Sequence, residues 1–200
     1  MNRIDLKNQA KEMLRGKWLI VILAILVVEA ATGSGTLSWV HPVFGAVGGL
    51  VTILLLPISV GHANLHYNIA LGKEENIGDL LVAFNQKSYF RALIGMLLMI
   101  VYIFFWTILF IIPGFVKGLA YSQTLFILQD PDFNDLSGDE AITKSREMMD
   151  GHKMEYLILG LSFILWYIAV GLTLGLLLFY VGPYVQQTMA QYYLKLKSGN

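Results

Sequence analysis

The stretch ALIGMLLMIVYIFFWTILFIIPGFVKGLAYSQTLFIL, residues 92–128, decides the fold class of this chain. It forms most of an apolar block from about Tyr89 to Leu128, and its only charged side chain is Lys117. A helix needs about 20 apolar residues to cross a membrane, so this block is long enough for two crossings. Pro113 and Gly114 break helices readily, and they predict where the two crossings separate.

Two further apolar blocks flank this one. The first runs from Trp18 to about Leu71 with a break near Thr32–Pro42, and the third runs from Tyr156 to about Leu194 with a glycine-flanked turn at 171–175. Each block is again long enough for two crossings. The chain is 56% hydrophobic and only 14% charged, whereas soluble domains carry about 25% charged residues. We therefore predict an all-α integral membrane protein, one domain over residues 1–200, with six transmembrane helices arranged as three hairpins.

The positive charges are confined to the segments between these blocks. Of the fourteen Lys and Arg residues, all but Lys117 lie in residues 1–17, 72–91, 144–153 and 195–197. Cytoplasmic loops of membrane proteins are enriched in these residues, so we predict a plasma-membrane protein with both termini in the cytoplasm. The net charge is zero, which argues against a nucleic-acid partner, and the absence of cysteine excludes disulfides and thiolate chemistry.

An amphipathic segment precedes each predicted hairpin. The apolar stripes share helical spacing; they comprise Leu6, Ala10, Met13 and Leu14, then Ile77, Leu80, Leu81 and Phe84, then Ala141, Ile142, Ser145, Met148 and Met149. Ser137 and Glu140 fit a capping box at the start of the third, and Gly151 suits its end. Such helices either lie on the cytoplasmic membrane surface or pack on the bundle, and the sequence leaves both open.

The chain also has a weak internal repeat. Ala10-Lys-Glu-Met-Leu-Arg-Gly16 aligns without a gap with Ser145-Arg-Glu-Met-Met-Asp-Gly151. We interpret this as a threefold repeat of one helix and one hairpin, with units at about 1–72, 73–130 and 131–200. Parallel repeats of this kind occur in transporters, and simple duplication also produces them.

Polar residues inside the apolar blocks are the candidate site residues. They are Glu29, Asn64, Lys117, Ser122 and Gln187. Charges in a membrane interior usually pair, so Glu29 and Lys117 form an ion pair in one interpretation and each reach the outer surface in the other. The uncharged residues either surround a polar cavity or hydrogen-bond between helices.

The chain has no recognisable catalytic arrangement. His62 and His66 have the i, i+4 spacing of a metal site but lack a third ligand, which favours hydrogen bonding between helices. The acidic run that begins at Asp130 lacks the spacing of a calcium loop, and we interpret it as a solvated loop. We therefore expect no enzyme activity, no metal and no cofactor.

Two motifs resemble a known family. Ile111-Ile-Pro-Gly-Phe-Val-Lys-Gly-Leu-Ala-Tyr-Ser122 and Glu140-Ala-Ile-Thr-Lys-Ser-Arg-Glu-Met-Met-Asp-Gly-His-Lys153 resemble the bacterial membrane family catalogued as domain of unknown function nine-seven-five. The resemblance covers the whole chain and implies a six-pass membrane protein without an established activity. The positions that carry its signature are Pro113, Gly114, Lys117, Tyr121, Ser122, Ala141, Ser145 and Gly151.

Two functions fit these features. The first is a non-enzymatic membrane protein that acts through membrane lipids, a peptide or another membrane protein, in envelope homeostasis or peptide protection; its amphipathic helices motivate this. The second is a small transporter, permease or transporter accessory subunit, motivated by the repeat and by Lys117, Gln187 and Asn64. A polar cavity that contains Lys117 would favour transport.

Overall fold

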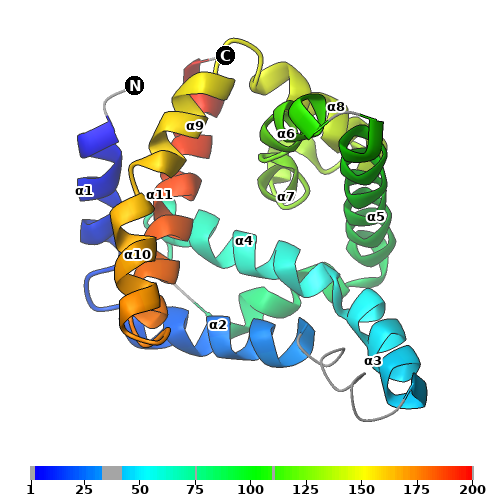
Figure 1. Ribbon diagram of the computed structural model, residues 1–200, viewed down its shortest axis with the longest axis horizontal. Helices are drawn as coiled ribbons and strands as arrows, with labels where there is room; N and C mark the ends of the chain where they lie inside the picture. Colours follow the sequence, from blue (N-terminus) through cyan, green and yellow to red (C-terminus); the bar gives the residue numbers. More distant parts are fainter. Residues whose placement is uncertain (1–2, 33–41, 75, 110, 200) are drawn as a thin grey trace.

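The computed structural model describes residues 3–32, 42–74, 76–109 and 111–199, and every regular element in these ranges is helical (Figure 1). Within them, the side chains of 29, 32, 42–47, 86–87, 109 and 111 lie outside the description. The all-α part of the predicted fold class is confirmed, since these ranges contain no strand.

The described residues of the N-terminal half form four α-helices and one 3-10 helix. They are α1 (Arg3–Met13), α2 (Trp18–Thr32), α3 (Pro42–Leu55), α4 (Pro57–Ala70) and η2 (Ile77–Phe84). Pro57 is the first residue of α4, where its missing N–H has no helical partner to lose.

The second predicted amphipathic helix, which contains Ile77 to Phe84, is the 3-10 helix η2. Its predicted apolar stripe is divided between two environments, because Ile77 and Leu81 are exposed while Leu80 is buried.

The C-terminal half begins with the long helix α5 and ends with the long helix α11. Its elements are α5 (Gln86–Leu109), α6 (Ile111–Ala120), α7 (Thr124–Ile127), η3 (Pro131–Phe133), α8 (Gly138–Met148), α9 (Lys153–Leu161), α10 (Ile164–Leu172) and α11 (Leu178–Gly199). The turn expected at 171–175 lies between α10 and α11, where Leu174 and Gly175 have positive φ angles of 52° and 89°.

The six predicted membrane-spanning helices are only partly matched by the described residues. Among the described residues, three helical stretches are long and apolar enough to cross a membrane: Gly48–Ala70, Ser88–Ile108 and Lys153–Leu172. The predicted fourth crossing is divided into α6, a turn and the short α7, because the chain folds back on α5 and α8. Figure 1 shows α4 lying across the direction of α9 and α10 rather than beside them.

The start of α2 and the start of α11 lie together. The rings of Trp18 and Tyr180 stack with their centroids 4.7 Å apart, and the Lys17 ammonium donates to the carbonyl of Lys73 at 3.1 Å. The charge pattern predicts Trp18 at the cytoplasmic boundary and the turn before Tyr180 at the opposite face of the membrane. In the structure α1 runs alongside α11 and the Trp18 ring stacks on Tyr180, which favours one common side for Trp18 and this turn, and the predicted sidedness stays to be tested.

Cysteine labelling tests this arrangement directly, since the chain contains no cysteine. We expect Lys17→Cys and Leu174→Cys to react with a membrane-impermeant maleimide from the same side of intact vesicles. Leu174 is 95% exposed and therefore accessible to the reagent. The cysteine-free parent chain gives the background. Labelling of the two variants from opposite sides would restore the arrangement that the charge pattern predicts.

The amphipathic helices α1 and α8 pack on protein. Leu6, Ala10 and Leu14 are almost completely buried, and α1 contacts α11 and α4. The predicted stripe of α8 is buried in the same way, from Ala141 to Met149. The predicted capping box is confirmed, since Ser137 Oγ accepts from the Glu140 N–H and the Glu140 carboxylate accepts from the Ser137 N–H. For α1 and α8, the structure therefore shows helices that pack on the bundle, which is one of the two alternatives that the sequence left open.

The two aligned repeat segments have the same local conformation. Gly16 and Gly151 follow their helices with φ angles of +83° and +77°, a region that glycine enters without steric cost. Leu14 and Met149, two positions before each glycine, are fully buried. The division into three repeat units stays a prediction.

A buried ion-pair cluster joins the end of α11 to the loop before α8. Asp130 is fully buried, and its carboxylate accepts from Lys197 Nζ at 2.6 and 2.7 Å and from the Tyr193 hydroxyl at 2.6 Å. Arg91 of α5 donates to the carbonyl of Phe133 in the same loop at 2.6 Å. The prediction of a solvated loop is therefore wrong for Asp130, because folding brings partners from α5 and α11 to this loop.

Candidate functional site

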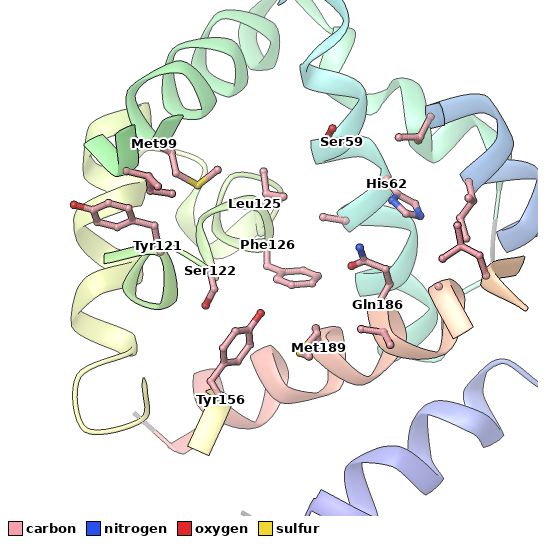
Figure 2. A pocket seen from close by; sticks show the side chains of 18 of the residues that line it. Ser59, His62, Met99, Tyr121, Ser122, Leu125, Phe126, Tyr156, Gln186 and Met189 are labelled. Atoms are coloured by element: carbon pink, nitrogen blue, oxygen red, sulfur yellow. The ribbon is translucent and has the colours of Figure 1, made fainter. Parts of the chain in front are cut away.

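A cavity of about 800 Å³ lies at the centre of the molecule and is partly open. Its wall is built from α2, α4, α5, α6, α7, α9, α10 and α11, together with the turn between α6 and α7. Figure 2 shows side chains from opposite walls, such as Met99 of α5 and Gln186 of α11, facing a common space. Residues from all three apolar blocks thus form one cavity.

The wall is mostly apolar and carries a few polar groups. The polar side chains include Ser59, His62, Ser122, Tyr156, Tyr167 and Gln186, and none of the described residues on the wall is Asp, Glu, Lys or Arg. Figure 2 shows the hydroxyls of Ser122 and Tyr156 facing each other across the cavity wall. Ser122 Oγ also accepts from Gln123 Nε2 at 2.8 Å.

The two histidines of α4 have different surroundings: His66 contacts α11, and His62 faces the cavity. His66 is fully buried, and its Nδ1 donates to Gln187 Oε1 at 2.9 Å. Its ring centroid is 5.0 Å from that of His62, which lines the cavity. His66 thus makes the hydrogen bond between helices that the sequence favoured. His62 Nε2 is buried and has no hydrogen-bond partner among the described residues, so it is free to bond a molecule in the cavity.

Of the four predicted site residues whose side chains the structure describes, only Ser122 lines the cavity. Asn64 and Gln187 are buried elsewhere, the latter against His66. Lys117 lies over the Trp106 ring at 4.8 Å rather than in the cavity, and the side chain of Glu29 is outside the described residues, so the proposed ion pair stays untested.

Sequence reasoning missed Tyr156 and Gly118 as cavity residues. Tyr156 begins the third apolar block, and an aromatic ring at the start of such a block is typical of the membrane boundary rather than of a cavity. The signal for Gly118 is a helical glycine with open space next to it: no atom lies within 4 Å of the position that a Cβ would occupy. That signal is visible only in the tertiary structure.

Comparison with known families identifies the chain. The family described as "Protein of unknown function (DUF975)" matches residues 1–117 and 108–200, which together cover the whole sequence. The chain belongs to this family. Comparison with curated proteins and with solved structures gives no match. The resemblance inferred from the two motifs is therefore confirmed, and membership of DUF975 assigns no activity.

Several signature positions of this DUF975 chain form the junction of α5, α6 and α8. Ser145 Oγ donates to the carbonyl of Ala120 at 2.8 Å and accepts from the Gln123 N–H at 3.2 Å. A Cβ on Gly114 would come within 2.7 Å of Thr107 Cα, so α5 and α6 approach closely there. The other signature positions in and around α6 and α8 are Pro113, Lys117, Tyr121, Ser122, Ala141 and Gly151. Of these signature positions, Tyr121 and Ser122 line the cavity.

Proposed function

We propose that this protein is a non-enzymatic membrane protein that binds a lipid-like molecule in its central cavity. The cavity of about 800 Å³ carries the proposal. Sites for small ligands measure about 300–1,000 Å³ and combine an apolar wall with a few placed polar groups. This cavity has both properties, since His62, Ser122, Tyr156 and Gln186 are set in an otherwise largely apolar wall.

The surroundings of the cavity support a ligand that comes from the membrane. α5 and the pair α9–α10 are long and apolar enough to span a bilayer, and most of their surface is not buried inside the protein. An acyl chain that leaves the bilayer for an apolar cavity exchanges one apolar environment for another. The polar groups on the wall then select the ligand, because a buried polar atom such as His62 Nε2 gains from a hydrogen-bond partner.

A lipid-binding protein and a transporter, the two functions that the sequence suggests, would treat a ligand in this cavity differently. A transporter or permease subunit would move its ligand across the membrane, whereas a lipid-binding protein would retain it. Flux of a labelled lipid across vesicles containing the purified protein would favour the transporter. The roles in envelope homeostasis and peptide protection stay predictions from the sequence.

Filling the cavity tests the proposed function. Gly118 lines the cavity and has open space at its Cβ position, so Gly118→Leu is expected to place an apolar side chain in the cavity without displacing the backbone. Native mass spectrometry of the protein extracted from membranes should show a bound lipid in the parent chain and at least tenfold less in Gly118→Leu. This magnitude assumes a loss of about 1.4 kcal/mol or more in binding free energy.

Gly160→Leu is the matched control for this experiment. Gly160 is also a helical glycine with no atom within 4 Å of its Cβ position, and it does not line the cavity. We expect this variant to retain lipid as the parent does. Equal lipid retention by Gly118→Leu and Gly160→Leu would contradict the proposed function.

A further inference from the structure

Three cationic side chains lie at helix ends beside the cavity wall. Lys117 is in the last turn of α6, Arg146 is in the last turn of α8, and Lys153 is the first residue of α9. One hydrogen bond and one helix contact bring these ends together. Ser145, next to Arg146, donates to the carbonyl of Ala120 at the end of α6, and α9, which begins at Lys153, contacts α6.

The positive charges of these side chains act on one another. Burial and the charges of Arg146 and Lys153 lower the pKa of the Lys117 ammonium, and α6 contacts α9. Lys117 therefore does not stand alone as an intramembrane charge.

The cationic charge of this group is only partly balanced. Asp150 pairs with Lys153 at 3.2 Å, and Asp139 accepts a hydrogen bond from Tyr102 at 3.0 Å. Within the part of the chain that the structure describes, neither Lys117 nor Arg146 has a carboxylate at ion-pair distance. Arg146 is exposed and Lys117 partly so, which leaves both available to an anion.

The group also adjoins the cavity. Gly118 follows Lys117 directly, and Ser122 and Tyr156 lie on the cavity wall within five residues of Lys117 and Lys153. The Trp106 ring beneath Lys117 is partly exposed, as is typical of rings at the level of lipid headgroups. A ligand with an anionic headgroup at these side chains therefore has its apolar chain next to the cavity.

We propose that Lys117, Arg146 and Lys153 bind the phosphate of an anionic phospholipid whose acyl chain occupies the central cavity. Arginine bonds phosphate oxygens through its planar fork, and lysine adds point charges. Basic pockets between transmembrane helices bind lipid headgroups in this way. The inference rests on the proposed function for the acyl chain, while the headgroup selectivity is its own claim.

The test compares phosphatidylglycerol with phosphatidylcholine as ligands of the purified protein in mixed micelles. We expect the parent chain to prefer phosphatidylglycerol, and Lys117→Gln together with Arg146→Gln to reduce that preference by roughly fivefold per cation removed. Lys144→Gln is the matched control, because Lys144 is also on α8 but pairs with Glu147 at 3.7 Å. An unchanged preference in the double variant overturns the headgroup assignment.

Two further arms separate the possible failures. Gly118→Leu should reduce the affinity for phosphatidylglycerol and for phosphatidylcholine equally. If neither affinity changes, the proposed lipid site in the cavity is wrong, while the headgroup selectivity is judged separately by the cation variants. Inorganic phosphate is the second competitor. If it displaces phosphatidylglycerol at concentrations equal to those of a soluble short-chain phosphatidylglycerol, the group is a free phosphate site and the lipid assignment is overturned. Much weaker competition by inorganic phosphate supports the lipid.

Discussion

Replacing Asp130 with asparagine is expected to lower the free energy of unfolding by about 3–5 kcal/mol, because it leaves the Lys197 ammonium next to a neutral amide in a buried site. In the parent chain the Asp130 carboxylate is fully buried and bonded to both Lys197 and Tyr193. The measurement is thermal or denaturant unfolding in detergent, followed by tryptophan fluorescence.

Asp132→Asn is the matched control for this prediction. Asp132 also contacts Lys197 at 2.6 Å, but its side chain is 71% exposed. Exposed ion pairs contribute about 0–1 kcal/mol, so this variant should unfold almost like the parent. Equal stability losses in the two variants would show that the burial of Asp130 is not what matters.

The same cluster predicts a dependence of stability on pH. Burial raises the pKa of the Asp130 carboxyl, but the hydrogen bonds from Lys197 and Tyr193 outweigh burial and lower that pKa below its ordinary value. Its contribution to stability is therefore present above the unfolded-state pKa of about 3.9 and is lost as the pH falls through the folded-state value.

The lysine of the pair behaves in the opposite sense. Burial lowers the pKa of Lys197, but the hydrogen bonds to Asp130 and Asp132 outweigh burial and raise it above its ordinary value. Its contribution is present below the unfolded-state pKa of about 10.4 and is lost as the pH rises through the folded-state value.

Asp130→Asn removes the carboxyl that titrates at acidic pH. This variant should therefore lose less stability between neutral and acidic pH than the parent chain does.

Gly61→Ala is expected to destabilise the protein by about 3 kcal/mol, at the upper end of the usual cost of overpacking. An added Cβ would overlap the carbonyl oxygen of Leu80 and come within 2.7 Å of its Cα. The obstacle is backbone rather than a flexible side chain, so α4 and η2 must move apart. Unfolding measurements on the purified variant check this.

Gly160→Ala is the matched control for the second prediction. No atom lies within 4 Å of its Cβ position in α9, and alanine is favoured over glycine in a helix by about 1 kcal/mol. This variant should be as stable as the parent or more so. If Gly61→Ala matched it, the contact between α4 and η2 would not be as close as the structure has it.

The sequence predicted helix ends correctly where the end is formed by residues close together in the chain. Ser137 and Glu140 cap α8 as predicted, and Gly16 and Gly151 both have positive φ angles after their helices. These features depend on side chains only a few residues apart, so the sequence contains all the information they require. The buried stripes of α1 and α8 were predictable for the same reason.

The number and direction of the helices were not predictable in this way. The segment from Gly114 onward is apolar enough to resemble a crossing, yet it folds into α6 and α7 against α5 and α8. An apolar side chain that faces lipid and one that faces protein have the same chemistry, so hydropathy does not distinguish them. The stacking of Trp18 on Tyr180 depends on residues more than 150 positions apart.

The sequence by itself determined that this protein is helical and rich in apolar helices, that α8 is capped, and that the chain belongs to DUF975. Only the tertiary structure decided that Asp130 is buried with Lys197, that Ser122 and Tyr156 share a cavity wall, and that α6, which carries Lys117, contacts α9, which begins at Lys153. The first set depends on short-range patterns and composition. The second depends on which distant segments pack together, and hydrophobic burial, which drives that packing, has no direction of its own.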